Sequence, residues 1–324
     1  MLADRLPLAL DADWLAGEGP IAVFGARGDD DFPGIDPARL TMVQRFRPDH
    51  DALAARGFAV VTALPGPVPQ AIVCLPRARD AARADIAAAA ALTGGRVVVD
   101  GARTDGVDGI RAELKKLGAL EGAISKAHGR ILLVDMAGVP GRAPGMVQNP
   151  AGYWTAPGVF SADGVDAGSA LLAGALPGDL GGRVADLGSG WGFLAATCLQ
   201  SGAVTECHLV DADHVALDCA RRNVTDARAR FHWADVTRWQ PPAPCDHVLC
   251  NPPFHQTRRP DPDLGRGFIA AAARALAPKG TLWLVANRHL PYEAALEEAF
   301  AEVTEIGGNA AFRLTKARRP RRRR

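Results

Sequence analysis

The sequence predicts two doubly wound α/β domains, each built on a mainly parallel sheet. The chain has 324 residues, which is more than a single domain usually contains. Its composition of 48% hydrophobic and 23% charged residues is typical of a folded protein. Short apolar runs alternate with amphipathic helical segments in both halves. A segment rich in proline and glycine, residues 138–157, separates the halves. We therefore place one domain at residues 1–145 and the other at residues 146–317.

The N-terminal half shows the alternation expected of a parallel sheet with covering helices. Strands are predicted at residues 71–75, 96–99 and 131–134, and helices at residues 80–92 and 107–117. A glycine-containing turn at residues 25–28 follows a strand, but it lacks the three-glycine spacing of a nucleotide-binding loop. This half is therefore predicted to be an α/β domain without a recognisable cofactor site.

The alternation is clearer in the C-terminal half. Strands are predicted at residues 183–187, 206–211, 230–235, 246–251 and 281–287, and helices at residues 193–200, 213–223, 267–277 and 292–300. Two final apolar runs, residues 303–306 and 311–315, are separated by a short turn of two glycines and an asparagine. We expect a mainly parallel sheet that ends in an antiparallel hairpin.

The sequence indicates neither a metal site nor a membrane-spanning segment. The six cysteines are scattered without a Cys-x-x-Cys pair, so reduced buried thiols are expected, and neither they nor the eight histidines show the spacing of metal ligands. No run approaches the ~20 apolar residues of a membrane span. Aspartates at positions 4, 11 and 13 argue against a signal peptide. We expect a cytoplasmic protein, and a monomer.

Positive charge is concentrated at the C-terminus. The formal net charge is +1, and residues 316–324 carry seven basic and no acidic side chains, which leaves −6 for residues 1–315. Such a run is either a solvated tail or an arm that contacts phosphate groups, and both interpretations stay open. We call residues 318–324 the basic tail.

A glycine-rich turn follows the first strand of the C-terminal domain. It contains Gly188, Ser189, Gly190 and Gly192, and it lies where doubly wound folds bind a nucleotide or nucleoside. A dinucleotide fingerprint would need a small residue at position 193, which is phenylalanine, and the strand carries Asp186 near its end. Because a carboxylate repels pyrophosphate and attracts ammonium and sulfonium groups, the pattern predicts a cationic cofactor.

Two further acids stand at the predicted ends of the next two strands. Asp211 can accept hydrogen bonds from both hydroxyls of a ribose; it can also cap the following helix, although Asp213 is better placed for that role. Asp235 can accept from an adenine amino group while Val236 covers the ring. Any one of these acids could be an ordinary turn residue. Three of them, each at the carboxyl end of a successive strand, indicate a cofactor site.

The fourth strand continues into Asn251, Pro252, Pro253 and Phe254. The two prolines fix φ and have no N–H, so the backbone after Asn251 is stiff. The asparagine offers a side-chain oxygen, Pro252 a main-chain oxygen and Phe254 a flat face, which together can hold a planar amino group. Alone, the motif would be a turn after a strand. Behind three strand-end acids it predicts the catalytic site, with Asn251 among the cofactor-binding residues as well.

Residues 150–317 resemble the class I methyltransferases that modify the guanine N2 amino group of ribosomal RNA. The resemblance is strongest to the members that act on the RNA of the small subunit. The similar stretches are residues 157–161, 166–169, 188–192, 251–255 and 285–292. That family also has an N-terminal domain resembling a duplicated methyltransferase fold that has lost its cofactor loop, and residues 1–145 are similar to it, chiefly at 101–108 and 124–129. The resemblance implies a degenerate N-terminal domain that recognises RNA or substrate.

The resemblance also implies the chemistry. S-adenosyl-L-methionine would be the cofactor, ribosomal RNA or the small ribosomal subunit the partner, and the guanine amino nitrogen would attack the activated methyl group directly. Asn251 and Pro252 would orient that amine without a general base, and His255 would have an orienting or structural role. Two rivals stay open: a release-factor glutamine methyltransferase, whose Asn-Pro-Pro motif typically continues with tyrosine, and a non-catalytic RNA-binding assembly factor.

Overall fold

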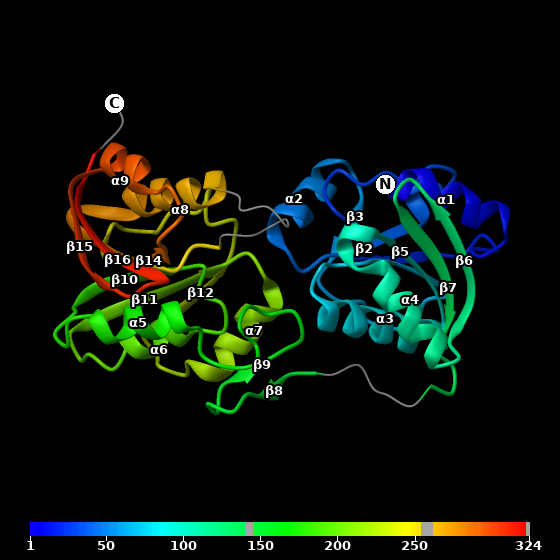
Figure 1. The fold of residues 1–324 in the computed structure, drawn as a ribbon, viewed down its shortest axis with the longest axis horizontal. Coiled ribbons are helices and arrows are strands. Elements are labelled where there is room, and N and C mark those ends of the chain that lie inside the picture. Colours follow the sequence, from blue (N-terminus) through cyan, green and yellow to red (C-terminus); the bar gives the residue numbers. More distant parts are fainter. Residues whose placement is uncertain (140–144, 254–261, 322–324) are drawn as a thin grey trace. The chain divides into compact units, whose positions relative to one another are not determined.

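The structure, a computed structural model, describes residues 1–139, 145–253 and 262–321. The chain divides into two compact units, Met1–Gly145 and Met146–Arg324 (Figure 1). We call them the N-terminal unit and the C-terminal unit. Each has its own sheet and its own hydrophobic core.

The N-terminal unit is built on a seven-stranded sheet. Its elements are α1 (Leu2–Asp11), β1 (Ile21–Phe24), β2 (Leu40–Val43), α2 (Arg47–Ala55), β3 (Ala59–Val61), β4 (Gln70–Cys74), α3 (Arg79–Thr93), β5 (Arg96–Ala102), α4 (Val107–Lys116), β6 (Leu120–Lys126) and β7 (Gly129–Asp135). The strand order is β3-β2-β1-β4-β5-β7-β6, and β7 alone is antiparallel to its neighbours. Helices α3 and α4 bury their apolar faces on one side of the sheet, and α1 packs on the other.

The C-terminal unit repeats this arrangement. After a short ribbon of β8 (Val147–Gln148) and β9 (Trp154–Thr155) come α5 (Ala167–Ala175), β10 (Gly182–Leu187), α6 (Phe193–Cys198), β11 (Val204–Asp211), α7 (His214–Asn223), β12 (Ala229–Trp233), β13 (Cys245–Cys250), α8 (Pro262–Ala275), β14 (Leu276–Asn287), α9 (Glu293–Ala299), β15 (Phe300–Gly308) and β16 (Phe312–Pro320). The strand order is β12-β11-β10-β13-β14-β16-β15. Helices α5, α6 and α7 cover one face and α8 and α9 the other (Figure 1).

The two sheets have the same topology. Counted from the first strand of each sheet, both run 3-2-1-4-5-7-6, and in both the seventh strand pairs antiparallel with the fifth and sixth. The predicted fold class, two doubly wound domains with a terminal antiparallel hairpin on the second, is therefore confirmed. The N-terminal unit ends in the same kind of hairpin, which the sequence did not indicate.

Some predicted boundaries were wrong. Strand β12 ends at Trp233, because the carboxylate of Asp235 turns back to accept a hydrogen bond of 2.8 Å from the backbone of Thr237. Strand β14 begins at Leu276, which pairs with Cys245, where helix was expected. Strands β2 and β3 have four and three residues, too few to show a periodicity in the sequence.

The basic tail is shorter than expected. Strand β16 runs to Pro320 rather than ending at Thr315, and Arg318 pairs with Thr281 of β14 in the sheet. Arg319 contacts Glu302 of β15 at 3.0 Å. The first part of the tail therefore belongs to the hairpin, and residues 322–324 lie outside the described part of the chain.

Within the described residues, no helix is long and apolar enough to cross a bilayer. In the same part of the chain, no cluster of three or more histidine, cysteine or acidic side chains is arranged to hold a metal ion. All six cysteines are buried free thiols.

Candidate functional site

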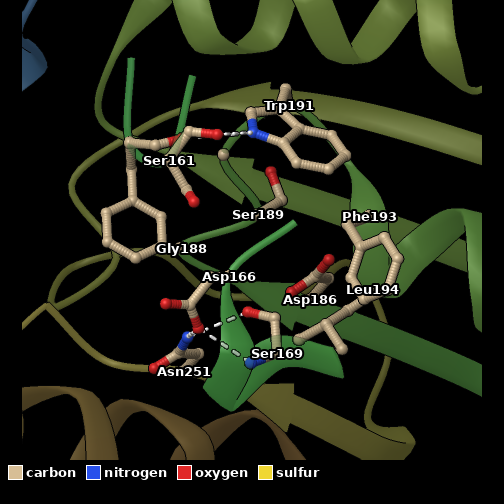
Figure 2. A pocket seen from close by; sticks show the side chains of 12 residues that line it. Ser161, Asp166, Ser169, Asp186, Gly188, Ser189, Trp191, Phe193, Leu194 and Asn251 are labelled. Atoms are coloured by element: carbon tan, nitrogen blue, oxygen red, sulfur yellow. Dashed lines mark hydrogen bonds between the residues drawn. The ribbon is translucent and has the colours of Figure 1, made fainter. Parts of the chain in front are cut away.

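A pocket lies at the carboxyl ends of β10 and β13 in the C-terminal unit (Figure 2). It holds about 410 Å³ of empty space, part of it open to solvent. This is the edge of a doubly wound sheet where ligands bind. The residues around it come from α5 and the segment before it, from β10, from the glycine-rich turn, from the start of α6 and from the end of β13: Phe160, Ser161, Asp166, Ser169, Asp186, Gly188, Ser189, Gly190, Trp191, Phe193, Leu194 and Asn251.

The glycine-rich turn needs its glycines for two reasons. Gly188, Gly190 and Gly192 have φ values of 77°, 53° and 91°, a region that side chains with Cβ rarely adopt. A Cβ on Gly192 would also lie 2.9 Å from the side chain of Val224, so this glycine lets α6 pack closely. At Gly188 and Gly190, which line the pocket, the turn thus presents backbone without a side chain.

Asp186 supplies a buried carboxylate to the pocket wall. Its side chain is 1% exposed, and one oxygen accepts a hydrogen bond of 3.1 Å from the backbone nitrogen of Ala195. Burial raises the pKa of Asp186 to about 7. Within the described residues, its other oxygen and the hydroxyl of Ser189 are buried without a hydrogen-bond partner. Such unpaired groups fit a cationic ligand with hydrogen-bond donors.

Asp211 and Asp213 divide the two roles expected of them. Asp213 is the N-cap of α7 and accepts a hydrogen bond of 3.0 Å from Val215. Asp211, the last residue of β11, accepts from Gly190 at 2.7 Å and from Asp213 at 2.8 Å. Burial raises the pKa of Asp211 to about 6. The prediction that Asp213 is the cap is confirmed.

Asp235 and Val236 are not among the residues that line the pocket of Figure 2, and neither is Asp211, although it accepts a hydrogen bond from Gly190, which does. One oxygen of Asp235 is held by the backbone and hydroxyl of Thr237, at 2.8 and 2.7 Å. The side chain of Val236 is 1% exposed and packs in the hydrophobic core, so it does not offer a face to a ligand ring in this structure. The assignment of these residues to adenine stays a prediction.

Asn251 is held by two residues from a distant part of the chain. Its amide nitrogen donates to Asp166 and to the hydroxyl of Ser169, both at 2.9 Å (Figure 2). Pro252 follows it directly and is buried. Phe254 and His255, to which stacking and orienting roles were assigned, lie outside the described residues.

Other members of the pocket had no site role assigned from the sequence, although residues 157–161 and 166–169 belong to stretches that resemble the family. The indole nitrogen of Trp191 donates to the carbonyl oxygens of Phe160 and Ser161, at 3.1 and 3.3 Å, and so ties the glycine-rich turn to the segment before α5. Phe160 itself is 54% exposed at the pocket. Asp166 is the N-cap of α5, and an acid before an apolar run indicates by itself a helix start and not a site.

The N-terminal unit lacks the corresponding side chains. Its first strand ends at Phe24, which pairs with Val43 and Val73, just as Leu187 pairs with Val210 and Cys250. By this register the positions of Asp186, Asp211 and Asn251 correspond to Val23, Gln44 and Cys74. The two units also share the geometry of this turn. The side chain of Gln44 accepts a hydrogen bond of 2.8 Å from the backbone nitrogen two residues further on, and Asp211 does the same. The N-terminal unit therefore has the backbone geometry of the site without its functional side chains.

Comparison with known proteins agrees with this architecture. The sequence model of the methyltransferase small domain family matches residues 151–316, and the chain belongs to that family. Ribosomal RNA large subunit methyltransferase G of Pseudomonas aeruginosa (strain UCBPP-PA14) is 33% identical over 212 residues, which are 62% of this chain and 57% of that protein. The corresponding protein of Ectopseudomonas mendocina is 37% identical over 164 residues, 49% of this chain and 44% of its own. This chain thus spans only about half the length of these curated relatives.

A solved structure extends the similarity to both units. The 16S rRNA N2 G1207 methyltransferase (RsmC) of T. Thermophilus, determined in complex with AdoMet and guanosine, superposes with a TM-score of 0.77 over 98% of this chain and 91% of its own. The two sequences are 24% identical, so the likeness establishes the two-domain fold.

Proposed function

We propose that this chain is an S-adenosylmethionine-dependent methyltransferase that methylates the exocyclic N2 amino group of a guanine in ribosomal RNA, most simply the 16S RNA of the small subunit. The observation that carries the proposal is the orientation of Asn251 at the end of β13. Its amide nitrogen donates hydrogen bonds to Asp166 and Ser169, so its oxygen is available to accept from an amine. The names of the three similar proteins reported above, each a ribosomal RNA methyltransferase, support it.

The cofactor site follows from the strand ends. Asp186 would accept from the ammonium group, the turn from Gly188 to Gly192 would approach the ligand through its backbone, and Asp211 would accept from the ribose hydroxyls. Asp235 and the backbone at Val236 would lie towards adenine. When bound, the cofactor supplies a methyl group on a sulfonium, a good leaving group. The protein's contribution is then mostly to hold both reactants in line.

The acceptor is oriented by Asn251 and Pro252. The side-chain oxygen of Asn251 and the main-chain carbonyl of Pro252 would each accept a hydrogen bond from the guanine amino group. These two bonds would direct the lone pair of the amine at the methyl carbon. Both oxygens also stabilise the positive charge that develops on nitrogen. Methyl transfer to the amine would leave a strongly acidic ammonium, which would lose its surplus proton afterwards, so Asn251 and Pro252 need only orient the amine and no dedicated base is needed.

The RNA must present an accessible base. A paired guanine cannot reach a pocket at a sheet edge, so the target nucleotide would be single-stranded or swung out of its helix. We assign RNA or substrate recognition to the N-terminal unit, which keeps the fold without the site, and additional phosphate contacts to the basic tail. A cytoplasmic monomer is part of the proposal.

One labelling experiment tests this function. Purified protein with methyl-labelled cofactor is offered bare 16S RNA, bare 23S RNA, both ribosomal subunits and a release factor, and labelled RNA is digested to nucleosides. N2-methylguanosine from small-subunit RNA is the expected product. If the same product came from 23S RNA only, the substrate would be the RNA of the large subunit, as the names of the curated relatives suggest. Label only in the release factor, or in nothing, would overturn the proposal.

A further inference from the structure

The orientation of the Asn251 amide is fixed by chemistry. An ionised carboxylate can only accept hydrogen bonds, so the Asn251 atom 2.9 Å from Asp166 must be the amide nitrogen. The second amide hydrogen points to the hydroxyl of Ser169, also at 2.9 Å. With both hydrogens engaged, the amide has only its oxygen left for another ligand. This removes the ambiguity that usually attends an asparagine in a site.

Asp166 and Ser169 are themselves firmly held. Asp166 is the N-cap of α5, and the carboxylate oxygen that faces Asn251 also accepts from the backbone nitrogen of Ser169 at 2.8 Å. Helix α5 buries Leu172 completely in the core of the C-terminal unit. The three side chains therefore form one network, drawn in Figure 2, that links the start of α5 to the end of β13.

We propose that Asp166 and Ser169 are positioning residues for methyl transfer, and that the negative charge of Asp166 acts through the Asn251 amide on the acceptor amine. This rests on the proposed function. A carboxylate at the nitrogen end of an amide polarises the group, because hydrogen bonds in a chain strengthen one another, and so makes the oxygen more negative. A more negative oxygen binds the amine more strongly as positive charge develops on it, which lowers the barrier.

Exchanging the two side chains tests this directly. In Asn251→Asp two carboxylates face each other, so kcat should fall by about a hundredfold. In Asp166→Asn the contact survives without its charge, so kcat should fall by about tenfold. The double variant Asp166→Asn/Asn251→Asp restores a donor opposite a carboxylate, and its kcat should exceed that of Asn251→Asp by about tenfold or more.

A pH profile separates this role from a merely structural one. In Asn251→Asp, the two carboxyl groups should share a proton, so the residual activity should rise as the pH is lowered, and this dependence should disappear in the double variant. Asp163→Asn is the matched control, because this exposed aspartate lies in the same segment. Ser169→Ala should lower kcat by a few fold and leave cofactor affinity unchanged.

The outcomes are distinguishable from those of the proposed function. If the wild-type protein methylates RNA while Asp166→Asn matches it and the double variant shows no recovery, the positioning role is wrong and the function stands. If the wild type methylates nothing, the network is still testable by NMR. The side-chain amide signal of Asn251, assigned by its loss in Asn251→Ala, should shift in Asp166→Asn and not in Asp163→Asn; an unmoved signal would contradict the network.

Discussion

The carboxylate of Asp211 accepts a hydrogen bond of 2.7 Å from the backbone nitrogen of Gly190, which ties the end of β11 to the glycine-rich turn. The other oxygen accepts from Asp213 at 2.8 Å. Each carboxylate oxygen has more than one acceptor site, so both can also take a ribose hydroxyl. The same side chain therefore shapes the turn and is available to the cofactor.

Asp211→Ala should weaken cofactor binding at least tenfold. The change removes two charge-assisted hydrogen bonds to ribose, each worth about 1.5–3 kcal/mol, and calorimetry measures the loss. Asp213→Ala is the control: it removes the cap of α7 and should cost about 1 kcal/mol of stability while cofactor affinity stays within a few fold. Equal affinity of Asp211→Ala and wild type would exclude Asp211 as a ligand.

Cofactor affinity should depend on pH through Asp186. Its pKa is raised to about 7 by burial, so the carboxyl group is partly protonated at neutral pH. An ammonium group favours the ionised form, so binding should release a proton, and affinity should fall by about tenfold for each pH unit below the pKa. Calorimetry in buffers of different ionisation enthalpy measures the released proton. In Asp186→Asn the affinity should be low and nearly independent of pH between about 7 and 8, above the pKa of about 6 that burial gives Asp211.

The sequence revealed those parts of the site that have a local pattern. Asp186 and Asp211 lie at the ends of apolar strands, and Asn251 heads a proline pair, so each could be placed on the correct sheet edge. Asp166 and Ser169 could not be found in this way, because they stand 85 and 82 residues from Asn251 and meet it only through the packing of α5. Val236 was assigned from its neighbour, but the turn after β12 buries it.

The fold was predictable for a similar reason. Long, buried strands and amphipathic helices carry a periodicity, whereas the four- and three-residue strands β2 and β3 do not. The equivalence of the two units needed the pairing registers. Only these place Val23, Gln44 and Cys74 opposite the functional positions of the other unit.

One cofactor should bind per chain. The N-terminal unit has the uncharged Gln44 where the C-terminal unit has Asp211, and a valine in place of Asp186. Titration of the full-length protein should give a stoichiometry of one, and Asp186→Asn/Asp211→Ala should abolish all heat of binding. A second binding event that survives in this double variant would contradict the degenerate character of the N-terminal unit.

Removing Arg322, Arg323 and Arg324 should weaken RNA binding and reduce its salt dependence. The sheet should be unaffected, because β16 ends at Pro320 and the backbone of Arg321 bonds to Ala299 at 2.8 Å. Each lost phosphate contact should lower the slope of log affinity against log salt by about one. Replacing the three arginines by lysine keeps the charge and should keep the slope. An unchanged slope after truncation would favour a solvated tail.

Asn251→Ala should separate catalysis from cofactor binding. The asparagine amide is anchored to Asp166 and Ser169, and its remaining atom, the oxygen, is assigned to the amine. Its loss should therefore leave cofactor affinity within a few fold while kcat falls by about a hundredfold or more. Single-turnover methylation with preformed cofactor complex measures kcat without interference from binding, and thermal melting checks that α5 and β13 remain packed. A variant that methylates at the wild-type rate would show that the Asn-Pro-Pro turn is only a turn. If it fails to bind the cofactor instead, Asn251 belongs to the cofactor site and the acceptor must be held by other residues of the pocket.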